Sequence, residues 1–512
     1  MLPWNRWKRW AALAGAMALL ASLAGCSTLP KSYYENSSEE SSEPAESSGP
    51  SVEEPAQRAL TLCYSSGDTL NPFTAATRSN LSLASLLYQG LTALDDGWVP
   101  QPSLASSVSV SAGSVTAVLR EDAVFSDGSP VTAADAAASY RAAKSSSNYA
   151  ALLENVTGVS ADKDGRTLTF SLSSPDPNAA ACLSFPVIKE GTESNPVGSG
   201  PYVFTKEGSA ALTANPHYSG PLANETIQLK DYPEGDTTIR ALESGTISFY
   251  FDDLSSGDIP RTSSANISVP LNSLVFLGVN SRRAPLSDAA VRQAVSAAVS
   301  RSELAANAFA GRAQPAVSPF SAQWEPAVEL TGFDANENIA VAVAQLEQAG
   351  YNNTDEDSSN GKSLSLELLV SDSNSFRTAA AELLVQQLSK AGITVEVAAV
   401  PFAEYEERLA DGEFDLYLGE IRLSAHMSLR PLFSSGGAAS YGVNTGGAAA
   451  AAYTEYRNGQ KTLAEFVQAF ADDLPYIPLC WRDGLAAYDR SLSGVTPTAF
   501  DSYYGIGSWS FS

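Results

Sequence analysis

One stretch in the second half of the chain constrains the fold most, because predicted strands and helices alternate along it. Residues 364–370, 393–397 and 414–418 are apolar runs that predict strands. Between them, apolar residues recur at helical spacing over 376–388, and a second helix is expected over roughly 402–410. Short connections between such alternating elements predict parallel strands with right-handed crossovers. Ligands bind beyond the carboxyl ends of strands in these sheets, so we expect ligand-binding residues after the third strand.

The same α/β pattern extends through the rest of the chain. Thr132 and Asp135 have the spacing of a capping box, which predicts a helix ending near Lys144. Ser287 is expected to cap another helix. Apolar or alternating runs predict four further strands, over 60–64, 114–119, 167–172 and 274–280. We place a boundary between two lobes just before the last of these strands.

The chain begins with three basic side chains and an apolar run over 11–20 that is too short to span a bilayer. This pattern predicts an export signal over 1–25. The residues at its end, Leu23-Ala24-Gly25-Cys26, resemble the lipobox of bacterial lipoproteins, in which the cysteine thiol receives diacylglycerol. An ordinary secretory peptide with an incidental cysteine is the alternative interpretation.

Residues 26–58 are rich in Ser, Glu and Pro and contain almost no large apolar side chains, which predicts a disordered tether. No second apolar run approaches the length of a membrane span, so the lipid on Cys26 would be the permanent anchor. We therefore expect a protein outside the cytoplasm, held at the cell membrane on the periplasmic face or on the external surface.

The formal net charge of −26 argues against nucleic acid or anionic lipid headgroups as direct partners. The acidic residues are scattered, which is typical of a solvated surface. With Cys26 assigned to lipid, Cys63, Cys182 and Cys480 remain, so at most one disulfide can form among them. The fold therefore does not depend on a disulfide framework.

Catalytic motifs are absent from the sequence. There is no Gly-x-Ser-x-Gly elbow, and Gly361-Lys362-Ser363 lacks the upstream glycine of a phosphate-binding loop. Two histidines, His217 and His426, are too few for a His-rich zinc site, and no Cys-x-x-Cys motif occurs. We expect a protein that is not an enzyme and needs no cofactor, and a glycosidase-like pair of carboxylates remains the hydrolase alternative.

A series of short segments resembles the family of bacterial extracellular solute-binding proteins that serve peptide and nickel importers. The most specific is Leu119–Asp135, which contains the Phe125-Ser126-Asp127-Gly128 turn and the helix start at Thr132. The order and spacing of the segments cover nearly everything from about Leu60 to the C-terminus. The other matching segments are Leu70–Phe73, Leu87–Leu91, Pro102–Ala105, Asn195–Tyr202, Leu242–Gly245, Val291–Ala294 and Leu474–Leu479.

The resemblance implies an α/β, two-lobe periplasmic-binding-protein-like fold of type II, with a hinge between the lobes and an extra domain in the first. It implies a monomer whose lobes close over a ligand, so that the permease subunits of an ABC transporter read the closed state. The implied organisation is a first lobe over 59–272 with an extra subdomain about 73–190, a second lobe over 273–476, and a return to the first lobe over 477–512.

The expected ligand is a short peptide, although the chain departs from the peptide-binding members at one point. Those proteins commonly carry an aspartate after the strand equivalent to 414–418, where it pairs with the peptide's α-amino group. This chain has Glu420 nearby, which would either replace that aspartate or be solvated. Arg422 would either hold a carboxylate or pair with a neighbouring acid.

His426 lies close to where the family's nickel-chelate binder presents a histidine, and it would either contact such a chelate or make an ordinary hydrogen bond. No metal site is otherwise expected. Aromatic walls with a few polar groups suit varied organic ligands, although each such side chain is also a candidate for the core. The remaining predicted ligand-binding residues are Ser424, Tyr441, Asn444, Trp481 and Trp509.

The sequence therefore predicts an extracytoplasmic substrate-binding lipoprotein of an ABC importer. A binder of another solute, such as a nickel or other metal chelate or a glycan fragment, is the alternative within this class. A surface nutrient sensor that signals to a membrane kinase is the alternative outside it.

Overall fold

A computed structural model describes residues 58–206, 208–232, 236–351 and 362–512. Residues 58–512 form one compact unit. The predicted signal peptide over 1–25, the predicted lipid site at Cys26 and all but the last residue of the predicted tether lie outside the described residues.

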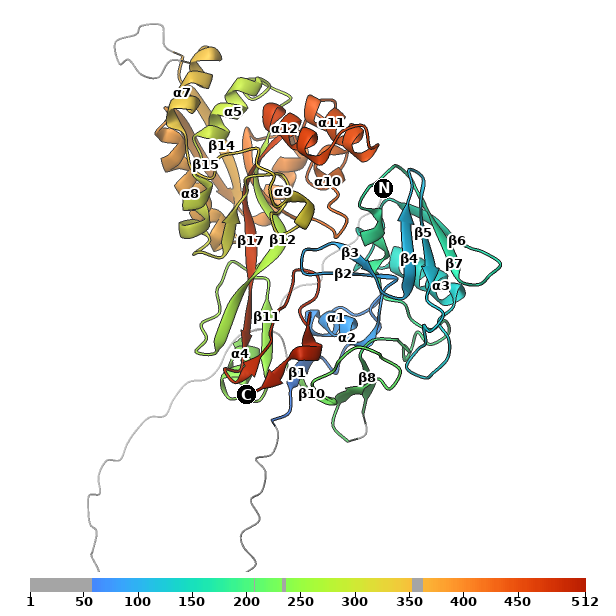
Figure 1. Cartoon of the computed structure of the whole chain (residues 1–512). Helices are drawn as coiled ribbons and strands as arrows, with labels where there is room; N and C mark the ends of the chain where they lie inside the picture. The colour runs from blue at the N-terminus through green and yellow to red at the C-terminus, as the bar shows by residue number, and fades with distance from the viewer. Residues whose placement is uncertain (1–57, 207, 233–235, 352–361) are drawn as a thin grey trace, which may run out of the picture. The chain divides into compact units, whose positions relative to one another are not determined.

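The largest sheet contains the alternating strands that the sequence predicts. Its order is β11-β17-β12-β16-β14-β15, and β13 pairs with β17 at its side. The strand β14 pairs in parallel with both β15 and β16, which confirms the predicted parallel arrangement. The helices α8 and α9 connect these three strands (Figure 1). The strands of this sheet are β11 (Phe249–Asp252), β12 (Ala265–Val279), β13 (Ala313–Pro315), β14 (Leu364–Ser371), β15 (Ile393–Val400), β16 (Leu416–Arg422) and β17 (Tyr476–Tyr488).

Two long antiparallel strands, β12 and β17, run from the upper part of the view in Figure 1 down to β11. Their pairing shifts register between Pro270 and Leu274. On one side of this irregularity Val269 packs in one hydrophobic core, and on the other side Leu274 packs in a second core. We call the part of the chain around the first core the first lobe and the part around the second core the second lobe. We propose that the lobe boundary lies at this register shift.

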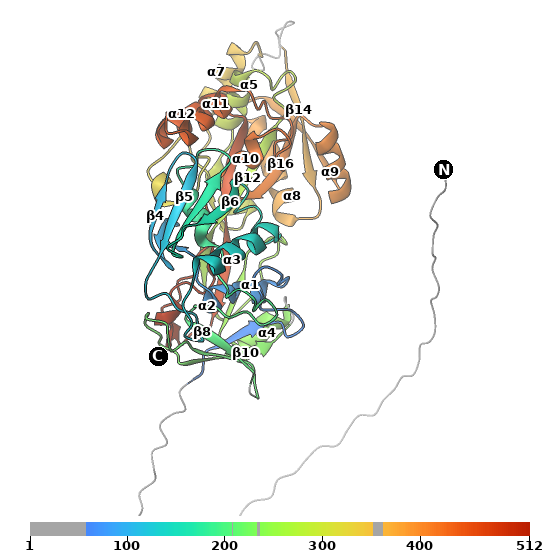
Figure 2. The same ribbon diagram turned by 90° about the vertical axis from the view of Figure 1, so that its right-hand side faces the viewer.

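The first lobe contains two four-stranded sheets. One has the order β1-β10-β9-β8, and the other is the antiparallel sheet β4-β5-β7-β6, against which α3 packs (Figure 2). The strands are β1 (Thr61–Tyr64), β4 (Ala105–Val110), β5 (Ser114–Leu119), β6 (Val156–Ala161), β7 (Thr167–Leu172), β8 (Tyr202–Thr205), β9 (Ala211–Ala214) and β10 (Thr226–Asp231). Two short pairs complete the strands, β2 (Thr92–Leu94) with β3 (Pro100–Pro102) and β18 (Leu492–Ser493) with β19 (Ser510–Phe511).

Of the two helix caps considered from the sequence, the structure confirms one and corrects the other. The Thr132 side chain and Asp135 form the predicted capping box of α3. The prediction that Ser287 caps α5 is wrong by one residue, because the Asp288 carboxylate accepts the hydrogen bond from the Ala290 backbone N–H. The helices are α1 (Arg78–Ser82), α2 (Ala84–Leu87), α3 (Ala133–Ser145), α4 (Asp236–Glu243), α5 (Ala289–Ala297), α6 (Arg301–Glu303), α7 (Ile339–Gln348), α8 (Ser375–Ser389), α9 (Phe402–Asp411), α10 (Arg430–Phe433), α11 (Ala448–Arg457) and α12 (Leu463–Asp473). Short 3₁₀ or π turns are η1 (Ala179–Ser184), η2 (Leu304–Ala308), η3 (Glu325–Ala327) and η4 (Ile506–Ser508).

Cys182 and Cys480 are free thiols. Burial raises the pKa of Cys480 to about 12, so this thiol stays protonated at neutral pH. A search of the described residues finds no helix with the length and apolar character that a membrane span requires.

Candidate functional site

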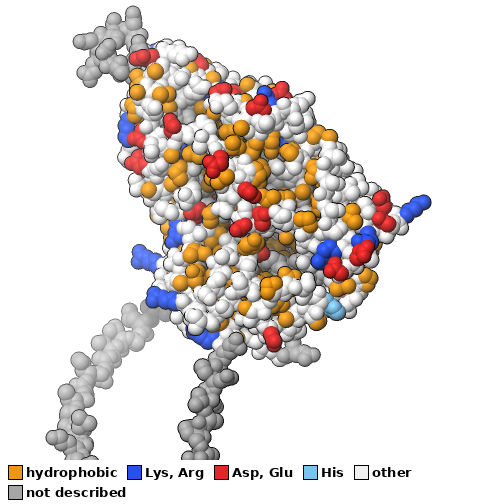
Figure 3. Space-filling view, viewed as in Figure 1, with side chains coloured by type: hydrophobic (Ala, Val, Ile, Leu, Met, Phe, Trp, Pro, Cys, Tyr) orange, Lys and Arg blue, Asp and Glu red, His pale blue; other side chains and the backbone are white. Residues whose placement is uncertain are grey.

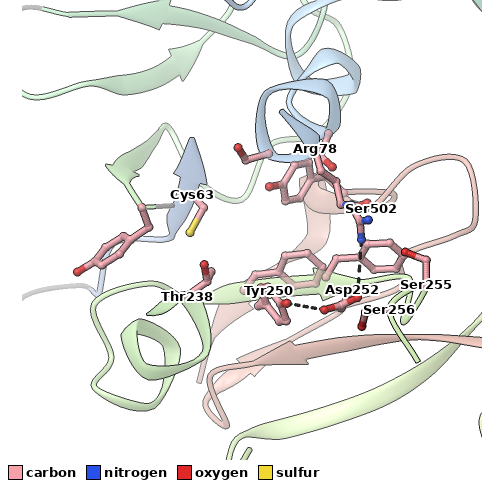
Figure 4. A pocket seen from close by; sticks show the side chains of 14 residues that line it. Cys63, Arg78, Thr238, Tyr250, Asp252, Ser255, Ser256 and Ser502 are labelled. Atoms are coloured by element: carbon pink, nitrogen blue, oxygen red, sulfur yellow. Dashed lines mark hydrogen bonds and ion pairs between the residues drawn. The ribbon is translucent and has the colours of Figure 1, made fainter. Parts of the chain in front are cut away.

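A cavity of about 280 Å³ lies in the first lobe, beside the strands that join the two lobes (Figure 4). Its walls come from parts of the chain that are distant in sequence: β1, α1, α4, β11 and the segment near the C-terminus. A volume of this size is near the lower end of that typical for small-molecule sites. The side chains named in Figure 4 are Cys63, Arg78, Thr238, Tyr250, Asp252, Ser255, Ser256 and Ser502.

Aromatic rings form the apolar part of this cavity, and they include Phe249, Phe251 and Tyr503. The rings of Phe249 and Tyr503 have centroids 5.6 Å apart, and Trp509 packs 4.9 Å from Phe249. Trp509 itself is completely buried. The structure therefore places this predicted ligand-binding residue behind the aromatic wall, where it supports Phe249.

Charged groups lie at the cavity, where Arg78 and Asp252 are part of its lining. The Nη1 atom of Arg78 lies 3.0 Å from Oδ1 of Asp253 and 3.7 Å from Oδ1 of Asp252. The Tyr250 hydroxyl donates a 2.6 Å hydrogen bond to Asp252 (Figure 4). Burial alone would raise the pKa of Asp253, but hydrogen bonds from Ser255 and the charges of Arg78 and Arg422 bring it below its ordinary value. Asp253 is therefore ionised at neutral pH.

Glu420 lies on β16 in the second lobe, where two arginines bind its carboxylate. Arg482 donates from Nε at 2.7 Å, and Nη2 of Arg377 lies 3.4 Å away. Arg482 is almost fully buried and also donates to the carbonyl oxygens of Asp253 and Leu254. In this structure the Glu420 carboxylate is therefore engaged by arginines and is not presented to a ligand amine.

Arg422, at the end of β16, is exposed to solvent and lies near other charged side chains. Its Nη2 atom donates a 2.7 Å hydrogen bond to the Ala499 carbonyl, yet the side chain is exposed. Desolvation lowers its pKa, the charges of Arg78 and Arg482 lower it further, and Asp253 acts in the opposite direction. Arg422 therefore contacts the segment near the C-terminus and also reaches solvent.

The charged side chains form two groups of ion pairs. Arg78 lies close to Asp252 and Asp253, and Arg377 and Arg482 bind the Glu420 carboxylate. Arg482 connects the two groups, because it also donates to the backbone carbonyl of Asp253.

His426 is placed elsewhere, at a second contact between the lobes. Its Nδ1 atom lies 3.1 Å from the Ser424 hydroxyl, and its Nε2 atom lies 4.0 Å from a carboxylate oxygen of Glu154 in the first lobe. Desolvation lowers its pKa to about 3, with smaller effects from the charges of Arg457 and Arg430. The imidazole is thus neutral and fully enclosed, and no cluster of three metal-ligating side chains occurs among the described residues.

Polar groups make up this second contact. The Ser428 hydroxyl donates a 2.8 Å hydrogen bond to Glu154, and Arg430 lies 3.8 Å from the same carboxylate. Arg457 on α11 forms a buried 3.1 Å ion pair with Asp176 and donates to the Pro175 carbonyl. Burial raises the pKa of Asp176 to about 6, although the charge of Arg457 acts against this shift.

The other predicted residues do not join either group. Tyr441 packs against Tyr417 and lines a separate hollow of about 520 Å³ with Arg282 and Arg283. Asn444 is exposed and donates through its backbone N–H to the Ser281 hydroxyl. Trp481 is buried in the core of the second lobe. Glu420 and Arg422 therefore lie on the same strand, β16. The other predicted residues lie elsewhere: Ser424 and His426 at the second contact between the lobes, Tyr441 at the separate hollow, Asn444 on the surface, and the two tryptophans in the cores.

The comparison with protein families agrees with this architecture. The model of the bacterial extracellular solute-binding proteins, family 5 (its middle part), matches residues 99–440, well over half of the chain. The chain belongs to the bacterial extracellular solute-binding proteins, family 5.

Several relatives of this solute-binding protein are known. The oligopeptide-binding protein AppA of Bacillus subtilis (strain 168) is 24% identical over 492 residues, which cover 84% of this chain and 87% of that protein. The structure of AppA from Bacillus subtilis in complex with a nonapeptide aligns with a TM-score of 0.57 at 22% identity, covering 90% of this chain and all of that one. A nickel ABC transporter structure from Bacillus halodurans aligns with a TM-score of 0.73 at 20% identity, covering 89% and 100%.

These similarities show a two-lobe α/β fold for this solute-binding protein. Its relatives are substrate-binding proteins of transport systems and not enzymes. Sequence reasoning alone missed Arg78, Asp252 and Asp253 as residues of the cleft. The one available signal was that Arg78 follows shortly after the Leu70–Phe73 segment, which resembles the family.

Proposed function

We propose that this family 5 protein is the extracytoplasmic substrate-binding lipoprotein of an ABC importer, which captures a short peptide between its lobes and delivers it to the membrane permease. The observation that carries the proposal is the aromatic cavity of the first lobe, which lies beside the joining strands and next to the segment where Arg482 donates to the Asp253 and Leu254 carbonyls. The oligopeptide-binding relative AppA supports a peptide as the ligand. The proposal includes a monomer anchored through lipid on Cys26, with no nucleic-acid partner.

The contacts between the lobes support capture by closure. Ser428 with Glu154 and Arg457 with Asp176 are polar contacts. Polar interfaces between domains resemble transient protein interfaces, which favours movement at these contacts, whereas Trp98 from the loop between β2 and β3 is buried in the second core. Closure over a ligand then requires a change at the register shift of β12 and β17, with each lobe keeping its own core.

A metal chelate has less support than a peptide. The alternative relied on His426, and this side chain is fully enclosed against Ser424 and Glu154. A chelate bound there would have to displace the contact between the lobes.

Thermal unfolding of residues 27–512 with candidate solutes tests the proposal. The set contains di- to hexapeptides, free amino acids, sugars and nickel–histidine. Because a ligand stabilises the folded state that binds it, we expect peptides to raise the midpoint, and His426→Ala to leave that rise unchanged. A rise with nickel–histidine alone that His426→Ala abolishes would replace the peptide with a chelate. Absence of a rise with every solute would overturn the proposed function.

A further inference from the structure

The sheet β4-β5-β7-β6 of the first lobe lies beside α10 and α11 of the second lobe (Figures 1 and 2). Glu154 and Asn155 come directly before β6, and residues 173–178 follow β7. Because Val156 of β6 pairs with Leu172 of β7, these two loops lie at the same end of the sheet. The cavity beside β11 is lined by other parts of the chain. The sheet therefore makes a contact with the second lobe that is separate from the cavity.

The inner part of this contact is an ion pair shielded from water. Arg457, the last residue of α11, has its Nη2 atom 3.1 Å from Oδ2 of Asp176, and both side chains are buried. Its Nε atom donates a 2.9 Å hydrogen bond to the Pro175 carbonyl. Asn178 donates to the Tyr456 hydroxyl at 3.4 Å. Two neighbouring residues at the end of α11 thus bind the loop after β7.

The outer part of the contact reaches solvent and uses both loops. The Ser428 hydroxyl donates a 2.8 Å hydrogen bond to Glu154, and Nη1 of Arg430 donates to the Ser174 hydroxyl at 3.3 Å. Asn155 donates to the Ser174 carbonyl and accepts from the Ser174 backbone N–H, so it ties the two loops to each other. The first-lobe side of the contact is therefore held in place by its own hydrogen bonds.

The two hydrophobic cores stay separate at this contact. Behind it, Leu153 and Ala179 belong to the first core, and Leu429 and Tyr453 belong to the second. Separation of polar surfaces leaves their charged groups to be solvated by water and does not break up either core. Trp98, which is buried in the second core, is an apolar attachment in another place. We therefore expect the contact to open by rotation about that attachment.

We propose that these two loops, with the start of α10 and the end of α11, form a clasp that holds the lobes close together before a solute binds and so favours capture. The proposal rests on the lobe movement of the proposed function, but it does not depend on which solute binds. It gives the sheet β4-β5-β7-β6 a role in closure that is independent of the cavity.

The separation of the lobes in solution tests the clasp without any solute. Spin labels are placed at Lys163→Cys, in the turn between β6 and β7, and at Gln460→Cys, after α11, because both positions are exposed. Cys63→Ser removes the least buried of the native cysteines in residues 27–512. Double electron–electron resonance then measures the distribution of distances between the two labels.

Two paired variants open different parts of the clasp. Asp176→Asn with Arg457→Gln removes the inner ion pair without leaving a buried charge unpaired, and Glu154→Gln with Arg430→Gln removes the outer one. We expect the inner variant to lengthen the mean distance between the labels by more than about 2 Å, and the outer variant to lengthen it less. Arg141→Gln, at an exposed position on α3, is the control and should leave the distance unchanged.

Melting curves check that each variant folds. An unchanged distance in the folded inner variant would overturn the clasp, and so would an equal lengthening in Arg141→Gln. If the inner variant does not fold, the outer variant decides in the same way: a lengthened distance supports the clasp and an unchanged one overturns it.

Peptide binding connects the clasp to capture. For a di- to hexapeptide that raises the unfolding midpoint, the inner variant should weaken the Kd about 3- to 10-fold in calorimetry, because the closed arrangement is then populated less. An unchanged Kd in a variant whose lobes separate would overturn the link to capture. If no peptide binds, the proposed function fails, and the distance between the labels alone decides the clasp.

Discussion

Individual charged residues between the lobes are more buried than a surface ion pair. The side chain of Asp176 is fully buried and that of Arg457 is 7% exposed. A buried pair is expensive to desolvate, but removal of one partner is more costly because an uncompensated charge remains. The raised pKa of Asp176 shows that desolvation outweighs the attraction of Arg457. The free energy of unfolding therefore depends on pH between about 4 and 6, where the folded protein binds a proton at Asp176.

We predict that Arg457→Met lowers the free energy of unfolding by about 3 to 5 kcal/mol at pH 7.5 and by clearly less at pH 5. The folded-state pKa of Asp176 is about 6, above the ordinary value of 3.8, so the folded protein takes up this proton as pH falls through 6. In the wild type this group therefore adds stability as pH falls from 6 toward 4. Below pH 6 the carboxyl is neutral, and the loss of Arg457 leaves less charge unpaired. Urea unfolding at both pH values measures the difference.

Arg430→Met is the matched control, because Arg430 belongs to the same contact but its side chain is 39% exposed. We expect this variant to lose less than about 1 kcal/mol at either pH. An equal loss for Arg457→Met at pH 5 and pH 7.5 would show that the Asp176 charge has no part in the effect.

At the scale of elements, local sequence patterns predict a strand or helix correctly where that element buries apolar side chains in a regular pattern. Short apolar runs predict the strands β14, β15 and β16, and apolar residues at helical spacing predict α8. Ser287 and Asp288 are both good capping residues, so the sequence alone does not decide which of them caps α5, and the structure shows Asp288 in this role. Element type was thus predictable and its first residue was not.

Gly278 of β12 allows the Tyr417 ring of β16 to pack directly against the backbone. Gly278 pairs with Tyr417 of β16, and a Cβ atom at Gly278 would lie 1.8 Å from the buried Tyr417 ring. We predict that Gly278→Ala lowers the free energy of unfolding by at least about 1 to 3 kcal/mol, because the ring has no free space to move into. Gly113→Ala is the control, since nothing lies within 4 Å of the added atom there. Similar urea midpoints for the two variants would contradict this packing.

At the scale of the whole molecule, the cleft depends on contacts that no local pattern encodes. Arg78 and Arg422 are separated by most of the chain, and Asp253 follows a short strand. Residues near Glu420 were predicted because the carboxyl ends of parallel strands meet at one edge, which is a general property of the fold. The aromatic chemistry of Tyr441 and Trp509 predicts contacts with a ligand, but the structure places Tyr441 in a separate hollow and Trp509 behind the aromatic wall.

Figure 3 shows hydrophobic side chains spread over one face of the molecule, with acidic groups scattered among them. Surface composition of this kind is ordinary for a folded protein, so it does not locate the ligand. We propose that the cavity beside β11 does so, because it combines a concave shape with charged side chains such as Arg78.

Hydrogen exchange with and without a bound peptide tests the central claim most directly, because it reports where on the chain the ligand acts. We predict slower exchange in both residues 249–256 of the first lobe and residues 416–423 of the second, with no change over 436–442 beside the separate hollow. Protection confined to one lobe, or centred on 436–442, would contradict a ligand site between the lobes.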